Sequence, residues 1–450
     1  MNLHGKTVAI AGLGRTALAL AKLLQAKGAE PFVSEMRSLE DVAEEASALT
    51  AAGIPFETGG HSEAMFTQAA LVVPSPGVSP RIPPIAAAVE AGVPVWSELE
   101  AAFRYCQAPI VAVTGTNGKT TVTELLRALL AGLGHDVILA GNNSRPFSDA
   151  VQQAPAPDYV VLEVSSYQLE GIVTFRPWMG AVLNVSPDHL ARHGAIEAYA
   201  AAKARMFENQ GVGDVAVLNA ADPRTAAMAQ QCPGAVRWFS TEGPVENGLW
   251  LDGETFRLGE TAVGDVRDTL LPGRHNLANV LAALTLIHAG GFPLETALES
   301  LRAFPGVEHR MEYAATVNGV DFYNDSKSTN IDSLRVALAC FSRPVVLIAG
   351  GEGKGEPYEA MRGYVRDHAR YLITLGEEAP RIEQAWGEVI PHERAADMKD
   401  AVQLAAARAR PGEAVLLSPA CASFDMFRNF EERGQAFKEC VRQLQQEPRP

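Results

Sequence analysis

Short apolar runs, each followed by a polar or glycine-rich turn, recur along the chain. They occupy residues 7–11, 71–74, 110–114, 159–163, 181–183, 215–218, 345–349 and 414–417. Continuous runs of this kind are typical of strands that are buried on both faces of a parallel sheet. Helix-periodic stretches, such as residues 17–27 and 196–209, lie between several of them. The pattern predicts an α/β protein with mostly parallel sheets.

Two breaks in the pattern indicate domain boundaries. One lies near Val95–Glu98, and the other lies at Pro305 and Gly306, which interrupt regular structure. A chain of 450 residues, 47% of them hydrophobic, exceeds a single core and favours two or three α/β domains. We therefore predict domains at residues 1–97, 98–306 and 307–450.

The stretch Pro109–Glu124, PIVAVTGTNGKTTVTE, reads as a strand, a phosphate loop and the start of a helix. Glycines let the backbone approach a polyphosphate, the helix N-terminus favours anions, lysine adds a positive charge and threonine can ligate magnesium. A glycine would be needed at Val113 for the general pattern, so this loop is a shortened variant. A chance G-K-T sequence is the alternative, but the flanking elements favour ATP or GTP binding. The loop comprises Gly115, Thr116, Asn117, Gly118, Lys119, Thr120 and Thr121.

A second glycine loop, Gly12-x-Gly14-x-x-Ala17, follows the first strand. Glu35 and Arg37 come after the next strand, as an acid does in dinucleotide-binding units. The alternative is a loop whose glycines only allow tight packing of strand and helix. A further turn, Ser75-Pro76-Gly77-Val78, ends a strand where open α/β sheets place ligand contacts.

Polar side chains follow the strands of the central region. Glu163 ends a buried strand and can hold magnesium, or it can cap the next turn; Ser165 and Gln168 follow it, and Asn142 ends a neighbouring strand. His189, after Asp188, fits a metal ligand or a surface histidine equally well. Lys203, judged on its local helix alone, is expected to be solvated. Asn276 could contact a base or cap its own helix.

The C-terminal region gathers cationic and hydroxyl side chains at three strand ends. Such a set fits a small anion, for example an amino-acid carboxylate. Its members are Asp325, Lys327, Thr329, Lys354, Ser423, Phe424, Arg428 and Phe430. His309 and Arg310, just past the domain boundary, offer two further cationic donors.

Charge and cysteine usage narrow the class of protein. The formal net charge of -15 argues against nucleic acid or an anionic membrane as the main partner. The five cysteines have no CxxC or metal-binding spacing, and no leader-like or bilayer-length apolar segment is present. We expect a soluble cytoplasmic protein without disulfides.

Taken in order, these segments resemble the ATP-dependent muramoyl-peptide ligases, the Mur ligase family, over essentially the whole chain. Two segments, Tyr323-NDSKSTN and Ser418-PACASFDMFRNFEERG, are similar to the members that add D-glutamate. The other segments that carry the resemblance are Gly115-TNGKTT, the Glu163 strand, Asn184-VSPDHL, Tyr199-AAAK, Gly273-RHN, Glu308-HR and Asp325-SK.

The resemblance implies three domains: N-terminal Rossmann-like, central P-loop ATPase-type with a mostly parallel sheet, and C-terminal Rossmann-like. It also implies an ATP-dependent ligase of peptidoglycan precursor synthesis, acting as a monomer on a UDP-linked muramoyl-alanine, D-glutamate and ATP. An acyl phosphate would form on the substrate carboxylate, and the amino acid would then displace phosphate to give an amide.

The resemblance further implies roles for individual residues. The UDP-linked substrate would meet Gly14, Arg15, Thr16, Glu35, Arg37, Gly77, Asn142, Ser165 and Gln168. ATP would meet the phosphate loop, Asn276, Arg310 and Asp325. Two Mg²⁺ sites would use Thr120, Glu163, His189 and a carbamylated Lys203. D-Glutamate would meet Thr329, Lys354, Ser423, Phe424 and Phe430. Catalytic roles would fall to Lys119, Glu163, His189, Lys203, His309 and Lys327.

Two positions depart from the family pattern. Asn142-Asn143-Ser144 stands where Asn-Ile-Gly is common, and Glu35 stands where aspartate is usual.

Three alternatives accompany the main interpretation: a family ligase for another amino acid, a nucleotide-dependent binding or regulatory protein, and, for the N-terminal glycine loop, a dehydrogenase. The last explains none of the later motifs.

Overall fold

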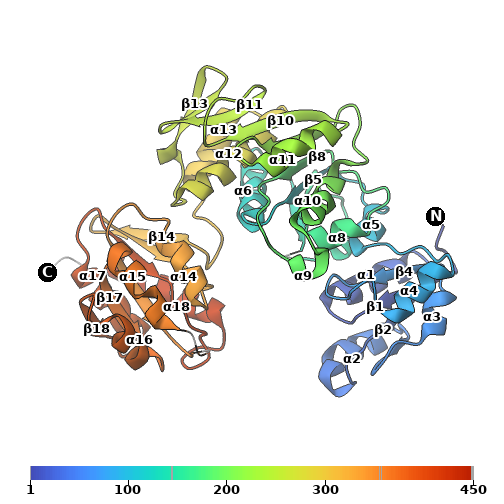
Figure 1. Cartoon of the computed structure of the whole chain (residues 1–450), viewed down its shortest axis with the longest axis horizontal. Helices are drawn as coiled ribbons and strands as arrows, with labels where there is room; N and C mark the ends of the chain where they lie inside the picture. The colour runs from blue at the N-terminus through green and yellow to red at the C-terminus, as the bar shows by residue number, and fades with distance from the viewer. Residues whose placement is uncertain (1, 143–144, 354, 356, 447–450) are drawn as a thin grey trace. The chain divides into compact units, whose positions relative to one another are not determined.

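The computed structural model describes residues 2–142, 145–353, 355 and 357–446, which form two compact units (Figure 1). The first unit comprises residues 1–265 and 278–300, and the second comprises residues 266–277 and 301–450. The first unit holds two sheets and the second holds one.

A four-stranded parallel sheet in the order β3-β2-β1-β4 begins the first unit. Because the order reverses between β1 and β4, the loops after these two strands meet at a topological switch point. There the hydroxyl of Ser75 donates to the Gly12 carbonyl at 3.3 Å. The strands are β1 (Thr7–Ala11), β2 (Glu30–Ser34), β3 (Phe56–Glu57) and β4 (Leu71–Pro74), and the helices are α1 (Arg15–Ala26), α2 (Ala43–Ala51), α3 (Glu63–Thr67) and α4 (Pro83–Glu90).

The central sheet has the order β13-β12-β11-β10-β9-β8-β5-β7-β6. Strands β5 to β11 all run parallel to one another, whereas β12 and β13 add an antiparallel edge. Strand β5 lies between β7 and β8, so the loops after these three strands share one edge. The strands are β5 (Ile110–Thr114), β6 (Val137–Gly141), β7 (Tyr159–Glu163), β8 (Met179–Val182), β9 (Val215–Asn219), β10 (Ala235–Ser240), β11 (Gly248–Asp252), β12 (Thr255–Leu258) and β13 (Thr261–Asp265).

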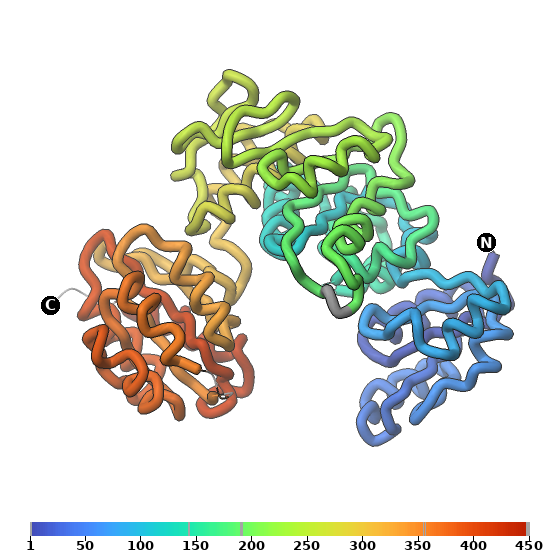
Figure 2. The backbone as a smooth tube through the Cα atoms, in the orientation of Figure 1, coloured from blue at the N-terminus to red at the C-terminus, as the bar shows by residue number. Residues whose placement is uncertain are grey.

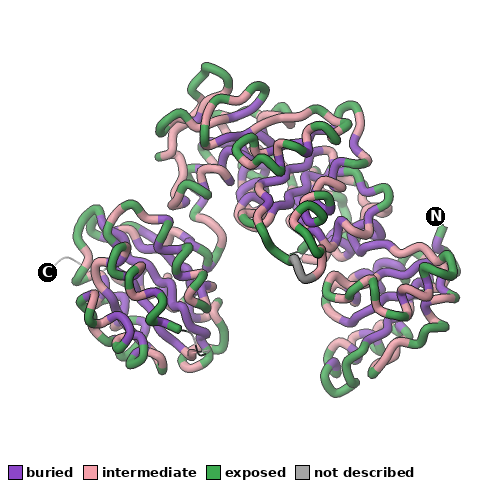
Figure 3. The backbone as a smooth tube through the Cα atoms, in the orientation of Figure 1, coloured by how far each residue is buried: buried purple, intermediate pink, exposed green. Residues whose placement is uncertain are grey.

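Helices flank this sheet, and the path of the chain through the region can be followed in Figure 2. The strands that carry the loops of interest are buried, as the purple segments of Figure 3 show. Burial of both faces explains their continuous apolar sequence. The helices are α6 (Lys119–Gly132), α7 (Phe147–Ala150), α8 (Ser166–Glu170), α9 (Leu190–His193), α10 (Ile196–Ala204), α11 (Pro223–Ala227), α12 (Arg274–Ala289) and α13 (Leu294–Ala303).

Helix α5 (Glu98–Phe103) links the two sheets of the first unit and is fixed by a buried carboxylate. Glu100 Oε2 accepts the backbone N–H groups of residues 173, 174 and 175 at 2.8–2.9 Å. Its Oε1 accepts Arg104 at 2.7 Å, and the Arg104 guanidinium stacks on Trp96 at 4.0 Å. The connecting segment is therefore bound tightly to the central region.

The second unit contains the six-stranded sheet β14-β15-β19-β16-β17-β18, in which only the β14–β15 pair is antiparallel. The carboxyl ends of β15, β19 and β16 are neighbours in this order. The strands are β14 (Glu312–Val317), β15 (Val320–Asn324), β16 (Val345–Gly350), β17 (Ala369–Leu375), β18 (His392–Arg394) and β19 (Ala414–Leu417), and the helices are α14 (Ile331–Leu338), α15 (Arg362–His368), α16 (Ala379–Trp386), α17 (Met398–Arg408) and α18 (Phe430–Gln446).

These three sheets confirm the predicted fold class, α/β with mostly parallel sheets. The domain limits at residues 97 and 306 stay predictions.

All five cysteines carry free thiols. Within the described parts of the chain, no helix has both the length and the apolar character needed to cross a membrane.

The carboxylate of Glu100 provides a test of how the first unit is held together. Glu100→Gln replaces one acceptor oxygen by a donor that faces N–H groups or the Arg104 guanidinium, and we expect it to lower the free energy of unfolding by about 2–4 kcal/mol. Urea unfolding followed by circular dichroism measures the loss. Glu90→Gln, at an exposed glutamate of α4, is the control and should change it by less than about 0.5 kcal/mol.

Candidate nucleotide and anion sites

The phosphate loop runs from the end of β5 into α6, and its shape requires glycine. Gly118, the residue before α6, has φ of 87°, and a Cβ there would lie 2.3 Å from Asn279 Oδ1. Lys119 Nζ donates to the Gly115 and Thr116 carbonyls, each at 2.9 Å, which holds its ammonium over the loop. Backbone N–H groups, a helix N-terminus and a lysine thus converge where a polyphosphate would bind.

Glu163 lies beside this loop, as its position at the end of β7 predicts. Its Oε2 accepts the Thr120 hydroxyl at 2.8 Å, and its Oε1 accepts Asn142 Nδ2 at 3.0 Å. Glu163 is 3% exposed, so its carboxylate oxygens face Thr120 and Asn142 rather than solvent. A hydroxyl on the first turn of α6 and a carboxylate at the end of β7 form an oxygen donor set of the kind that Mg²⁺ takes.

Asn184, after β8, fixes the conformation of the loop and had no role in the sequence-based site. Its Oδ1 accepts the Asn117 N–H at 2.9 Å, and its Nδ2 donates to the Asn117 carbonyl at 3.1 Å. The Thr116 N–H donates to the Asn184 carbonyl at 3.0 Å. Its role could have been predicted from the sequence, because Asn184 follows the strand that pairs with β5.

Lys203 is 1% exposed, so the expectation of a solvated lysine, drawn from its local helix, is wrong. Its Nζ donates to the Gly115 carbonyl at 2.9 Å and lies 4.4 Å from the centre of the Tyr199 ring. Burial lowers the pKa of Lys203 to about 7; the positive charge of Lys119 lowers it further, and Asp188 partly offsets this. The amine is therefore substantially neutral at neutral pH.

His189 belongs to an aromatic group beside Lys203. Its ring centre lies 5.0 Å from Tyr167 and 6.1 Å from Tyr199, and its Nε2 lies 3.5 Å from Asp188 Oδ2. The backbone of His189 has φ of 52°, a left-handed conformation that non-glycine residues seldom adopt. Tyr199 thus connects the predicted ligand His189 with Lys203.

In the N-terminal sheet, Glu35 and Arg37 brace the glycine loop. Glu35 Oε2 accepts the Leu13 N–H at 2.6 Å, and Arg37 Nη2 donates to the Leu13 carbonyl at 2.6 Å. Burial alone raises the pKa of Glu35, but hydrogen bonds from Arg37 and Leu13 outweigh it and bring the pKa to about 2. Gly14 and Gly77, predicted substrate contacts, have open space where a side chain would be.

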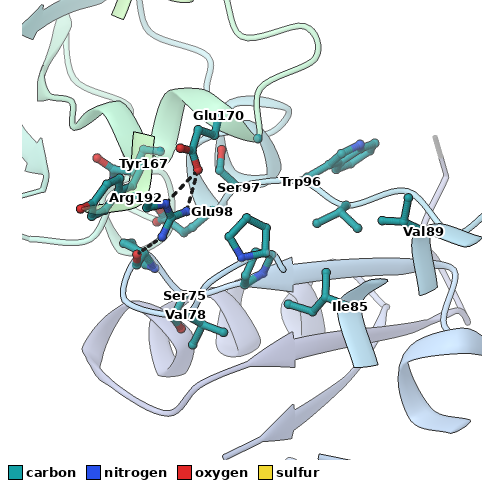
Figure 4. Close-up of a pocket in the computed structure, with 16 residues that line it drawn as sticks. Ser75, Val78, Ile85, Val89, Trp96, Ser97, Glu98, Tyr167, Glu170 and Arg192 are labelled. Carbon is teal, nitrogen blue, oxygen red and sulfur yellow. Dashed lines mark hydrogen bonds and ion pairs between the residues drawn. The ribbon is translucent and has the colours of Figure 1, made fainter. Parts of the chain in front are cut away.

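A pocket of about 200 Å³ adjoins the Ser75–Gly77 turn within the first unit (Figure 4). Arg192 lines it: its guanidinium stacks on Tyr167 at 4.1 Å, pairs with Glu170 at 2.6 Å and reaches the Pro76 carbonyl at 3.5 Å. Burial raises the pKa of Glu98, another lining residue, whose Oε1 accepts the Ser148 N–H. This pocket borders the predicted substrate contacts Gly77 and Gln168.

Some predicted contacts serve a structural purpose within the fold. Ser165 and Gln168 form a capping box at α8: Ser165 Oγ accepts the Gln168 N–H at 3.3 Å, and Gln168 Oε1 accepts the Ser165 N–H at 2.9 Å. Asn276 Nδ2 donates to the Pro272 carbonyl at 2.7 Å. Arg15 is exposed and Thr16 partly exposed at the start of α1.

In the second unit, Asp325 lies buried at the end of β15. Its Oδ2 accepts the Ser418 hydroxyl at 2.9 Å, and its Oδ1 accepts the Met311 N–H at 3.2 Å. Burial raises the pKa of Asp325 to about 7, although Ser418, Met311 and the charge of Arg310 oppose the shift. A carboxyl group that titrates near neutral pH marks a functional-site candidate.

Around Asp325 the structure gathers other predicted residues. The Lys327 N–H donates to the His309 carbonyl at 3.0 Å, and the Phe430 ring lies 6.0 Å from His309 and 5.7 Å from Lys327 Nζ. Ser423 is buried, Thr329 is partly exposed and Phe424 is 67% exposed. Lys354, like Asn143 and Ser144, lies outside the described residues.

Comparison with known proteins identifies the family. The Mur ligase MurD-like N-terminal domain matches residues 6–97, the Mur ligase middle domain matches 113–287, and the Mur ligase glutamate ligase domain matches 309–421. The chain belongs to the Mur ligase family. It is 42% identical to the UDP-N-acetylmuramoylalanine--D-glutamate ligase of Koribacter versatilis over 99% of both chains. It is 44% identical to the enzyme of that name from Pelotomaculum thermopropionicum over 98% of both.

Solved structures support the fold at lower identity. A UDP-N-acetylmuramoyl-L-alanyl-D-glutamate--2,6-diaminopimelate ligase has a TM-score of 0.59 at 22% identity, covering 84% of this chain and 93% of its own. MurF from Thermotoga maritima, solved in complex with ADP, has a TM-score of 0.55 at 16% identity, covering 92% and 95%. At these identities the likeness concerns the fold alone.

The buried Asp325 generates a prediction about pH and stability. Its pKa of about 7 exceeds the ordinary 3.8, so between pH 4 and pH 7 the folded protein binds more protons at this site than the unfolded chain. The free energy of unfolding should therefore fall as the pH rises through this range. Asp325→Asn, measured by thermal unfolding at pH 4.5 and pH 7.5, should gain stability relative to the parent at the higher pH. An equal difference at both pH values would contradict the assignment.

Proposed function

We propose that the protein is an ATP-dependent ligase that joins D-glutamate to UDP-N-acetylmuramoyl-L-alanine, releasing ADP and phosphate, in peptidoglycan precursor synthesis. The observation that carries this proposal is the match of 98–99% of the chain, at 42–44% identity, to relatives of that name. The separate sites of the two units supply the groups such a reaction needs: a phosphate loop with a carboxylate in one, and a cationic and hydroxyl cluster in the other.

ATP is assigned to the phosphate loop, with Mg²⁺ at Thr120 and Glu163. Among the described residues, no three His, Cys, Asp or Glu side chains cluster closely enough to hold a metal ion by themselves. Magnesium suits such a site, because it is commonly bound by one or two carboxylates together with substrate phosphates and water. When bound, the ion neutralises negative charge between the phosphates. His189, beside Asp188 and Tyr199, is the proposed ligand of a second ion.

The first step brings two anions together. The L-alanyl carboxylate attacks the γ-phosphorus of ATP, a bond from phosphorus to the carboxylate oxygen forms, and the bond to ADP breaks. Lys119, which lies over the loop carbonyls, is placed to hold the phosphates. Arg310, which is exposed, adds a positive charge near Asp325. His309 and Lys327 are assigned to the same phosphate region, and Asn276 to the adenine.

The second step forms the amide. The amine of D-glutamate attacks the acyl carbon, phosphate leaves with the bonding electron pair, and the nitrogen loses a proton. We assign the amino acid to Thr329, Lys354, Ser423, Phe424 and Phe430. The UDP-linked substrate is assigned to Gly14, Arg15, Thr16, Glu35, Arg37, Gly77, Asn142, Ser165 and Gln168, so Ser165 and Gln168 would combine helix capping with substrate contact.

Lys203 is proposed to be carbamylated. A neutral amine can attack CO₂ at carbon, forming an N–C bond and releasing one proton, and the product is an anion. The pKa of about 7 makes Lys203 a suitable nucleophile where an ordinary lysine is almost fully protonated. A carbamate there would replace a positive charge beside Lys119 by a negative one, which favours a metal ion at the loop.

Carbon-13 NMR of the enzyme in ¹³C-bicarbonate tests this modification. We expect one carbamate resonance whose intensity rises between pH 6 and pH 8, because deprotonation of Lys203 comes before attack on CO₂. Lys203→Met should remove the resonance and lower kcat by about 100-fold or more, since a metal-binding anion is lost. Lys22→Met, at an exposed lysine of α1, is the control and should leave both unchanged.

The activity itself is tested by phosphate release from ATP in the presence of UDP-N-acetylmuramoyl-L-alanine and Mg²⁺. We expect release that depends on D-glutamate and is at least 100-fold slower with L-glutamate, L-lysine, meso-diaminopimelate or no amino acid. Glu163→Gln should lower kcat by about 100-fold while leaving the fold intact by circular dichroism.

The other outcomes separate the alternatives. Release that depends on a different amino acid would keep the ligase reaction and overturn the assignment of D-glutamate. ATP binding without release under any of these conditions would favour a nucleotide-dependent binding protein.

A further inference from the structure

A buried cation in the second unit takes no part in the proposed mechanism. Arg433, on α18, is 2% exposed and is among the largest fully buried side chains of the protein. Burial lowers the pKa of Arg433 to about 10, which still leaves the guanidinium charged at neutral pH. A buried charge is costly unless its hydrogen bonds are satisfied, so its position needs an explanation.

The guanidinium is satisfied by neutral acceptors. Nε donates to Ser326 Oγ at 3.0 Å, and Nη2 donates to the Ser326 and Cys421 carbonyls at 2.9 Å and 3.0 Å. Nη1 donates to the Ala422 carbonyl at 2.9 Å. In the described residues no carboxylate forms an ion pair with it. Asp425 acts only from longer range, and its Oδ2 accepts the Glu377 N–H.

These bonds tie together the segments that carry the proposed amino-acid contacts. Ser326 belongs to the turn that leads to Thr329, and Ala422 directly precedes Ser423. Ser326 Oγ also donates to the Phe430 carbonyl at 2.8 Å, at the start of α18.

A fourth segment, the Gly350–Gly351 turn after β16, is joined to the same point. Ala422 exchanges two backbone hydrogen bonds with Glu352, at 2.9 Å and 3.0 Å. A Cβ on Gly351 would lie 3.0 Å from Arg433 Nη1 and 2.2 Å from the Ala422 carbonyl oxygen.

We propose that Arg433 is a positioning residue that holds these four segments together and gives the amino-acid site a fixed positive charge that no described carboxylate pairs with directly, so that an acidic amino acid is preferred over its neutral amide. The proposal rests on the proposed ligase function. The preference follows because a charge without a carboxylate partner, in a region of low dielectric, attracts a second carboxylate of the amino acid more strongly than a neutral amide. Lysine cannot reproduce four directed bonds to the Ser326 turn and the Cys421–Ala422 segment.

The test compares Arg433→Met, Arg433→Lys and Arg442→Met in phosphate-release assays with D-glutamate and with D-glutamine. Arg442 is the matched control, because it lies on the same helix, is about half exposed and pairs only with Glu439 among the described residues. Circular dichroism establishes that each variant is folded. Ser326→Ala, which removes one acceptor and keeps the charge, provides a second variant.

For Arg433→Met we expect the KM for D-glutamate to rise about tenfold or more, as for other residues that support a binding site from behind. The ratio of kcat/KM for D-glutamate over D-glutamine should fall by a similar factor. The KM for ATP should stay within about twofold. Arg433→Lys should keep most of the preference for D-glutamate while raising its KM, and Ser326→Ala should do the same to a smaller extent.

An unchanged KM for D-glutamate in both Arg433 variants would overturn the positioning role, and an unchanged preference in Arg433→Met would overturn the electrostatic role. A purely structural residue would lower the melting temperature and affect D-glutamate and D-glutamine equally. These outcomes differ from failure of the proposed function, in which the parent protein itself would release no phosphate in response to D-glutamate.

Discussion

Close approach of the backbone around the phosphate loop is the constraint on which the central region depends. A Cβ on Gly115 would touch Leu183 at 3.0 Å, and one on Gly118 would overlap Asn279. Within this narrow space the Gly115 carbonyl accepts both Lys119 and Lys203. The two lysine nitrogens therefore lie close together on one oxygen. Burial, together with repulsion by the positive charge of Lys119, gives Lys203 its unusual chemistry. The order of β7, β5 and β8 brings Glu163 and Asn184 to the same edge.

Two buried cations illustrate different ways to keep a charge inside a protein. Lys203 avoids the energetic cost of a buried charge by losing its proton, because burial and the like charge of Lys119 both disfavour its ammonium form. Arg433 cannot do so at neutral pH, and its planar guanidinium instead finds four neutral acceptors. The first arrangement yields a reactive nitrogen, and the second yields a fixed charge. Each lies beside a different proposed site.

The sequence predicted the parts of the fold and site that follow from strand order. Apolar runs gave the parallel sheets, and polar residues at the ends of those runs, such as Glu163 and Asp325, lie where parallel strands bring them together. It failed where a role depends on distant packing. Lys203 looks solvated in its own helix, and Arg433 looks like any arginine of an amphipathic helix. Both are buried by segments that are remote in sequence, which local periodicity cannot reveal.

The antiparallel strands β12 and β13 lie at the opposite edge of the central sheet from β6, and the order of strands places four others between them and β5. Their hairpin carries no residue assigned to either site, and its turn at Gly259 is exposed. Exposed loop tips of this kind tolerate insertions better than buried connections do. A fluorescent label or an affinity tag placed at this turn would report on the enzyme, or attach it to a support, while leaving the strand ends of the proposed ligand sites untouched.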